Sequence, residues 1–192
     1  MKKQLRNVSM VIGSLLALSV FPASAHNGFK FRAKLAGVEE VPVVSTRARG
    51  EFEARLDSDG SLSYKLSYEG LEGENTLFAH IHLGQANVNG GIMAFLCGGG
   101  TKPAPCPFPS GTVEGTITAT DITPIATQQL PAGGFEEFVR ALRNGTAYVN
   151  VHTVTSPGGE IRGQITDDNG RHKGHDRGGH DDRHDHDHNR RN

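Results

Sequence analysis

The sequence predicts an all-β domain built as an antiparallel sandwich or barrel. Apolar and polar residues alternate with a period of two in many short segments, which is typical of strands that bury one face. Glycine and proline separate these segments, and the chain of 192 residues holds 25 Gly and 9 Pro. One segment has helical spacing instead, so a single short helix is expected.

Three parts of the chain differ in composition. Residues 1–25 begin with basic side chains, continue with an apolar run over residues 8–21 and end in Ala23-Ser24-Ala25. This order predicts a secretory signal peptide that is cleaved after Ala25 and directs the protein to the periplasm or out of the cell. Residues 26–166 are long enough for one domain, and no second apolar run predicts a membrane span.

Residues 167–192 form a tail that is rich in His and Asp and lacks aliphatic and aromatic side chains. Such a segment cannot bury a core, so it is expected to be disordered. Imidazole and carboxylate groups on a flexible chain suit divalent ions, so binding of Zn²⁺, Ni²⁺ or Cu²⁺ is predicted. The alternative is a charged appendage that keeps the protein soluble. The candidate ligands are His172, His175, His180, His184, His186 and His188.

The charge of the chain argues against a nucleic-acid partner. The formal net charge is −1 with neutral His, and removal of the three basic side chains in residues 1–25 leaves about −4. A nucleic-acid-binding surface needs an excess of basic residues. A polar sheet face that binds a protein or a glycan is the interaction that the sequence leaves open.

The strands are expected where the alternation is regular. In the first segment, Phe29, Phe31 and Leu35 alternate with basic residues. The turn Asp57-Ser58-Asp59-Gly60 joins the second and third segments into a hairpin. The expected strands cover residues 29–35, 51–56, 62–68, 77–83, 91–96, 112–120, 146–153 and 160–165.

The helix is expected in the segment GGFEEFVRALRNG. Two Glu in its first turn and two Arg toward its last turn match the helix dipole, and Asn144-Gly145 can end it in a left-handed conformation. We expect it to cover an open end or edge of the sandwich. The apolar residues at helical spacing are Phe135, Phe138, Val139 and Leu142.

The two cysteines are expected to form a disulfide. Cys97 and Cys106 flank a loop rich in Gly and Pro, and an exported protein meets an oxidising compartment in which such a pair can close. The alternative is a metal or redox site, but the spacing is not Cys-x-x-Cys.

Two expected strands place histidines on one face. His80 and His82 share a face because residues two apart in a strand point the same way, and His152 shares a face with Tyr148 and Asn150. If the two strands are neighbours, the three His form a candidate site for zinc or copper. The alternative is that each His is a solvated or hydrogen-bonded residue on the polar face of its strand.

The sequence offers no clear catalytic group, which favours a non-enzymatic protein. It contains no Gly-x-Ser-x-Gly motif, and the glycines near Asn89 lack the following helix of a nucleotide loop. Glu39 and Glu40 are neighbours in a loop and are interpreted as solvated. His26 becomes the N-terminus after cleavage, where an amine and an imidazole can chelate copper, but nothing places a second His across from it.

Five segments carry a family resemblance: AKLAGVEEVPVV at 33–44, AHIHLGQANVNGGIMAFLC at 79–97, GTITATDI at 115–122, FEEFVRALRNGTAYVNVHT at 135–153 and PGGEIRGQI at 157–165. Together they resemble the CHRD domain, a module named after chordin that also occurs in exported bacterial proteins. The resemblance implies an immunoglobulin-like Greek-key β-sandwich but little about chemistry, because such bacterial members have no settled activity, and the growth-factor partners of chordin are not carried over. We therefore expect a non-enzymatic binding or interaction module.

A weaker likeness extends to copper/zinc superoxide dismutases. His80-Ile81-His82 and the late segment with Arg162 are similar to their copper-binding strand and to their Arg-containing segment. The chain departs from that pattern because residues 26–166 hold no His/Asp-rich zinc loop and no cysteine near Arg162. A copper or zinc protein or enzyme that uses His80, His82 and His152 is the alternative to the binding module, and dismutase activity is not expected.

Overall fold

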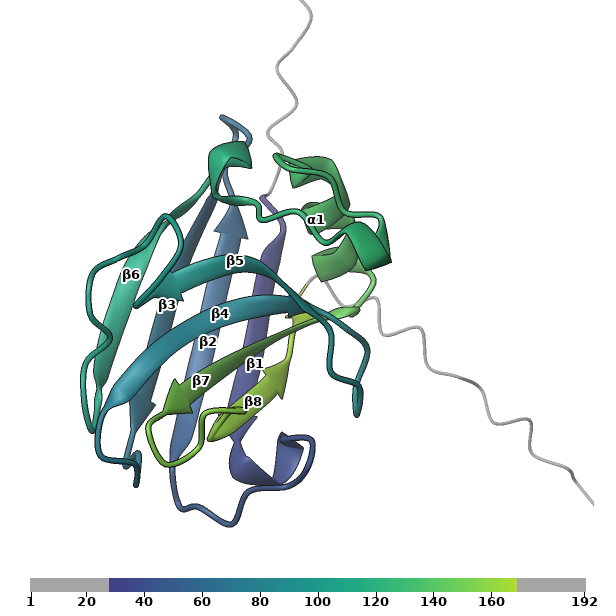
Figure 1. Ribbon diagram of the computed structural model, residues 1–192. Coiled ribbons are helices and arrows are strands. Elements are labelled where there is room, and N and C mark those ends of the chain that lie inside the picture. The colour runs from purple at the N-terminus through teal and green to yellow at the C-terminus, as the bar shows by residue number, and fades with distance from the viewer. Residues whose placement is uncertain (1–27, 169–192) are drawn as a thin grey trace, which may run out of the picture.

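The computed structural model describes residues 28–168 (Figure 1). The predicted signal peptide, His26 and the six candidate ligands of the tail lie outside the described residues, so those predictions stay as they are. Within the described range, no helix is long and apolar enough to span a membrane. The elements are β1 (Lys30–Ala36), β2 (Arg49–Leu56), β3 (Leu62–Glu69), β4 (Thr76–Leu83), β5 (Gly91–Cys97), β6 (Gly111–Ile117), α1 (Phe135–Arg143), β7 (Ala147–Thr153), β8 (Ile161–Gln164) and β9 (Thr166–Asp167), with 3-10 turns at Gly37–Glu39, Ala119–Asp121 and Ala126–Gln128.

All of these strands belong to one antiparallel sheet that folds over on itself into two layers. The strand order is β5-β4-β7-β8-β1-β2-β3-β6, and β9 pairs with β1. In Figure 1, β4, β5 and β7 cross in front of β1, β2, β3 and β6. The predicted all-β, sandwich-like fold is confirmed, with the difference that the two layers are halves of a single sheet.

The two layers join where β8 meets β1. Ala36 pairs with Arg162 at this seam. The backbones approach so closely that a Cβ atom on Gly163 would lie 2.3 Å from the carbonyl oxygen of Lys34. Glycine is therefore needed at the seam, because any other residue would push the two strands apart.

The main differences from the predicted strands are at β6 and at β9, whereas the other strand ends shift by at most two residues. β6 ends at Ile117 instead of residue 120, because the Asp121 carboxylate accepts hydrogen bonds from the backbone N–H and the hydroxyl of Thr118 and fixes a 3-10 turn there. Asp167 pairs with β1, and the Asp168 carboxylate lies 2.7 Å from the Arg32 guanidinium. These two residues were assigned to the tail, but they continue the pairing along β1 that begins with β8.

The core lies between the two layers and is built from alternate residues of the strands. In β1 the apolar side chains are buried, while the Lys and Arg side chains between them are exposed. Burial of each large apolar side chain stabilises the fold by roughly 1.5–3 kcal/mol. Large side chains of this core with at most 1% exposure are Phe31, Phe52, Leu62, Leu66, Ile81, Val149, Val151 and Ile161.

The predicted helix forms as α1 and closes one end of the sandwich, at the upper right of Figure 1. The helix residues Phe138 and Leu142 point into the core and are fully buried. The guanidinium of Arg143 lies 4.0 Å from the ring centre of Phe29, which holds the last turn against the chain before β1. Gly145 follows the helix with a φ of 66°, so the predicted left-handed termination is confirmed.

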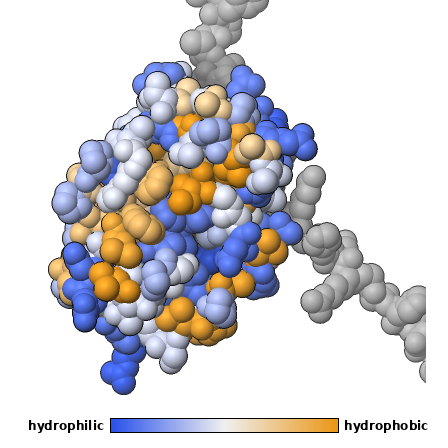
Figure 2. Space-filling model, in the orientation of Figure 1, coloured by the Kyte–Doolittle hydropathy of each residue, from blue (hydrophilic) through white to orange (hydrophobic). Residues whose placement is uncertain are grey.

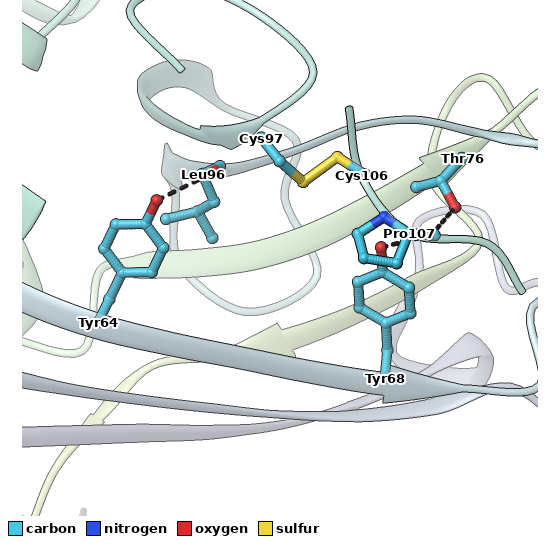
Figure 3. The surroundings of a disulfide bond; sticks show 7 residues. All are labelled: Tyr64, Tyr68, Thr76, Leu96, Cys97, Cys106 and Pro107. Carbon is cyan, nitrogen blue, oxygen red and sulfur yellow. Dashed lines mark hydrogen bonds between the residues drawn. A yellow bond between two sulfur atoms is a disulfide. The ribbon is translucent and has the colours of Figure 1, made fainter. Parts of the chain in front are cut away.

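The predicted disulfide is confirmed. Cys97 and Cys106 are bonded, with their Cα atoms 5.3 Å apart. Tyr64 and Tyr68, both on β3, donate hydrogen bonds of 2.8 and 2.7 Å to the backbone carbonyls next in sequence to the two cysteines (Figure 3). The disulfide loop is thus held to the other layer through the interior of the sandwich.

Replacement of both cysteines, Cys97→Ala/Cys106→Ala, is expected to lower the free energy of unfolding by about 2–3 kcal/mol, because loss of the bond frees a short loop in the unfolded chain. Urea unfolding of the variant and of the parent protein measures the difference. Thiol titration of the unfolded, non-reduced parent protein is the control. Two free thiols per chain would contradict the bond.

Candidate metal centre

The pairing of β4 with β7 brings the three in-sheet histidines together. His80 lies opposite Asn150 on β7, and His82 and His152 lie two residues to either side of this pair. The nitrogen atoms that could bind a metal, one from each His, all lie within 4.8 Å of one another. The condition that the sequence left open, that the two strands are neighbours, is met.

The three histidines lie on the outer face of the front layer, away from the core. Their neighbours in the strands, such as Ile81 and Val151, are fully buried in the core on the other face. Figure 2 shows hydrophilic residues in the middle of the outer face, with apolar residues around them. His80, His82 and His152 are only 1%, 8% and 5% exposed, so these side chains are not solvated, whereas the other form of that alternative, a hydrogen-bonded side chain, holds for His82 and His152.

The loops that follow β4 and β7 cover this face. The loop after β4 reaches back over His82 through the carbonyl of Gly90, and the loop after β7 reaches His152 through the carbonyl of Pro157. The Asn89 side chain also donates to the carbonyl of Val41 at 3.0 Å, which joins the first of these loops to the turn after β1. The layer is therefore buried on both sides.

Two of the histidines are oriented by backbone carbonyls. Nδ1 of His82 lies 2.8 Å from the Gly90 oxygen, and Nδ1 of His152 lies 2.9 Å from the Pro157 oxygen. A carbonyl only accepts, so each Nδ1 carries the proton and each Nε2 keeps its lone pair. Both Nε2 atoms are buried without a hydrogen-bond partner, and so are both ring nitrogens of His80.

Aromatic rings enclose the histidines. The ring of Phe78 stacks on His80 with centres 5.2 Å apart, and Phe95 meets His80 edge-on at 5.2 Å. The Tyr148 ring is parallel to that of His82 at 4.6 Å. These rings restrict how the imidazoles can turn and keep water away from them.

Arg162 continues this stack from the other side. Its guanidinium carbon lies 3.4 Å from the centre of the Tyr148 ring, and because β8 and β4 flank β7 on opposite sides, Tyr148 lies between Arg162 and His82. Arg162 is 2% exposed and donates to the side-chain oxygen of Asn89 at 3.0 Å. A buried positive charge therefore lies one aromatic ring away from the histidines.

Glu40 is the acidic residue of this region, and its interpretation as solvated is wrong. It is 5% exposed, and its Oε1 has no hydrogen-bond partner. Burial raises the pKa of Glu40 to about 7, and the charge of Arg162 opposes that rise. A Cβ atom on Gly159 would lie 2.3 Å from this Oε1 and 2.9 Å from Nδ2 of Asn150, so the carboxylate reaches the edge of the histidine cluster.

Burial keeps the histidines neutral. Removal from water lowers the pKa of His80 to about 2, and the neighbouring His82 and His152 lower it further. The same cause lowers the pKa of His82 to about 4, against the hydrogen bond to Gly90, and lowers that of His152. At neutral pH all three rings therefore offer lone pairs, which is the form that binds a metal.

The three residues fit a transition-metal ion. Nitrogens bound at about 2.0–2.1 Å to one ion lie roughly 3.3–3.6 Å apart, and the present separations are at most 4.8 Å. A shift of each ring by about 1 Å or less closes that difference. Neutral imidazole is a ligand for both zinc and copper, and the carbonyls behind His82 and His152 are the usual second partners of such ligands.

The sequence identified the three histidines but missed their surroundings. Alternation placed Asn150 and Tyr148 on the same face as His152, and Arg162 was noted only for a likeness to another family. Glu40 carries no signal in the sequence, because its burial depends on a loop that folds over a strand more than 100 residues later. The six candidate ligands of the tail lie outside the described residues and are not placed.

Comparison with known proteins gives one match. The family model described as the CHRD domain matches residues 31–165, which include β1 to β8 and the three histidines. No curated protein and no solved structure gives a significant match.

The metal-free protein is expected to lose stability as the pH falls from 7.5 to 5. The pKa of an unfolded His is about 6.5, whereas all three folded values are lower, so below pH 6.5 the unfolded chain binds more protons than the folded one. Each His is then expected to lower the free energy of unfolding by up to about 2 kcal/mol at pH 5. Urea unfolding in the presence of a chelator measures the trend.

Glu40→Gln is the control for this prediction. The pKa of Glu40 is higher in the folded protein than in the unfolded chain. Its contribution to the free energy of unfolding therefore has the opposite sign, and it increases as the pH falls from about 7 toward the pKa of an unfolded Glu. Removal of this carboxyl should therefore make the loss of stability on acidification steeper than in the parent protein. A stability that does not change between pH 7.5 and 5 in the variant would contradict neutral, buried histidines.

Proposed function

The chain belongs to the CHRD-domain family, and within that family we propose that this protein is a metal-binding module in which His80, His82 and His152 hold one transition-metal ion. The observation that carries the proposal is that one ring nitrogen of each histidine lies within 4.8 Å of the others, in a buried cluster where four ring nitrogens have no hydrogen-bond partner. Zinc and copper are the metals whose chemistry suits three neutral imidazoles.

An ion would satisfy atoms that the protein leaves without partners. A buried polar atom without a hydrogen bond costs about 1–3 kcal/mol, and His80, His82 and His152 together contribute four such nitrogens. Coordination uses one lone pair of each ring, and the proton on the other nitrogen of His82 and His152 is already paired with a carbonyl. His80 is the ligand whose second nitrogen gains a partner only by a small rearrangement of Asn150, which lies opposite it.

The site supports binding more strongly than catalysis. The three ligands are at most 8% exposed, and the rings of Phe78, Phe95 and Tyr148 surround them. A catalytic metal site needs an open position that a substrate can reach. Holding a metal ion for storage, transfer or stabilisation of the fold is therefore the role that we assign to the domain, in preference to an enzyme of the superoxide-dismutase type.

Export and a second metal-binding segment belong to the same proposal. The buried disulfide between Cys97 and Cys106 supports export through residues 1–25, because such bonds persist in oxidising compartments. The six His of residues 169–192 would bind divalent ions in several weaker arrangements, because ordering a segment whose composition predicts disorder costs conformational entropy in each arrangement. A protein or glycan partner for a polar sheet face stays a prediction from the sequence.

The test uses a full-length chain, called here the tail-neutral chain, in which all six tail histidines are replaced by Asn. It is expected to bind one equivalent of Zn²⁺ or copper at pH 7.5 with saturation, and bound metal should raise the melting temperature by mass action. Calorimetric titration and elemental analysis of the dialysed protein measure this. The replaced residues are His172, His175, His180, His184, His186 and His188.

His82→Asn/His152→Asn in the tail-neutral chain is the ligand variant. The Asn amide can still donate to the Gly90 and Pro157 carbonyls, but the Nε2 ligands are gone, so binding should be lost while the fold is kept. Lys65→Gln, on the opposite layer, is the matched control and should bind as the parent does. The proposal fails if the tail-neutral chain shows no saturable binding of zinc or copper, or if the ligand variant binds equally well.

A further inference from the structure

Resting on the proposed function, we propose that the ion of this site is monovalent copper, Cu⁺, held by His80, His82 and His152 alone in a three-coordinate arrangement. Three properties of the site favour Cu⁺: the charge of the ligands, the number of ligands, and the side chains that surround them. Each of these properties disfavours a divalent ion.

The ligands bring no negative charge. In residues 28–168 the group of side chains that converges within metal-binding distance consists of three histidines and includes no carboxylate or thiolate. The cost of burying an ion rises with the square of its charge, so a divalent ion in the same site costs about four times as much as a monovalent one. Neutral imidazoles offset less of that cost than anionic ligands would.

A fixed positive charge adds to this preference. The Arg162 guanidinium is 2% exposed, lies against Tyr148 and is separated from His82 by the thickness of that ring. Within the described chain it forms no salt bridge, because its hydrogen bonds go to the neutral oxygens of Asn89 and Val88, and Glu40 is the carboxyl group on which its charge acts. Repulsion from this cation is twice as large for a divalent ion as for Cu⁺.

The number of ligands also fits Cu⁺. Zinc sites are almost always four-coordinate, with a protein group or an open water position completing the tetrahedron, and Cu²⁺ prefers a tetragonal set. Copper(I) has a filled d shell and accepts three nitrogens in a plane. The sides of the cluster are formed by Phe78 and Phe95, which have no donor atom, and Tyr148 uses its hydroxyl to accept a bond from the Gly90 N–H.

Glu40 is the group that could favour a divalent ion instead. The Oε1 of Glu40 is buried and unpaired, and by moving over the cluster it could supply both a fourth ligand and a negative charge. The Oδ1 of Asn150 is also buried and unpaired, but it could supply only a neutral fourth ligand. The Glu40 carboxylate is not among the groups within 4.8 Å of one another. Zn²⁺ binding should therefore depend on Glu40, whereas Cu⁺ binding should not, and this difference separates the two ions experimentally.

The experiment measures the Cu⁺, Cu²⁺ and Zn²⁺ affinities of the tail-neutral chain at pH 7.5 by competition with chromophoric chelators. The Cu⁺ titration is anaerobic with excess ascorbate. One equivalent of Cu⁺ is expected to bind at least about 100-fold more tightly than Zn²⁺. X-ray absorption of the copper-loaded chain should show three nitrogen ligands at about 2.0 Å.

Two variants complete the design. Glu40→Gln should change the Cu⁺ affinity by less than about threefold while weakening any Zn²⁺ binding by about tenfold or more. The ligand variant His82→Asn/His152→Asn should lose Cu⁺. Tighter binding of Zn²⁺ or Cu²⁺ than of Cu⁺, or a fourth ligand in the copper spectrum, would overturn the assignment of Cu⁺ and leave the metal-binding function standing. Absence of all three ions from the tail-neutral chain would remove the function itself.

Discussion

The register between β4 and β7 is the constraint on which both the core and the site depend. Side chains alternate between the faces of a strand, so the pairing that sends Ile81 and Val149 into the core also sends His80 and Asn150 to the opposite face. A slip of one residue would bury the imidazoles in the apolar core and turn the apolar side chains outward. The hydrophobic energy of the core therefore fixes the positions of the histidines, although the core does not touch their ring nitrogens.

The disulfide loop extends this constraint to the cover of the site. Gly99 and Gly100 lie so close to the ring of Phe95 that a Cβ atom on either would be 2.6 or 2.5 Å from a ring carbon. Phe95 in turn packs edge-on against His80. Because Cys97, Cys106 and the tyrosines of β3 fix the ends of the loop, the loop holds Phe95 against the histidines. The ring of Phe95 therefore links the stability of the disulfide loop to the shape of the histidine cluster.

Local patterns allowed most of the fold to be predicted, because alternation, helix spacing and turn residues act over a few positions. They predicted the strands, the helix at Phe135–Arg143 and the disulfide, and they placed His80 and His82 on one face. They did not predict that this face is buried. In a local pattern, the polar side of a strand indicates exposure to water. Here that side is covered by the loops that follow the two strands, with Gly90 and Pro157, and by Glu40 from a distant part of the chain. The ends of β6 and β9 were missed for a similar reason, since side-chain contacts of Asp121 and Asp168 decide them.

The energetic cost of this buried polar face is itself an argument for a ligand. Six buried polar atoms lack partners within residues 28–168, and all of them belong to His80, His82, His152, Asn150 and Glu40. At about 1–3 kcal/mol for each atom, the total is comparable to the whole stability of a typical domain, about 5–15 kcal/mol. Scattered defects of this size would be removed by small changes of side chain, but here they gather at one place, around three rings held in fixed orientations. A bound ion that takes up the lone pairs would convert this local loss into stability, so folding and metal binding in this domain should be coupled.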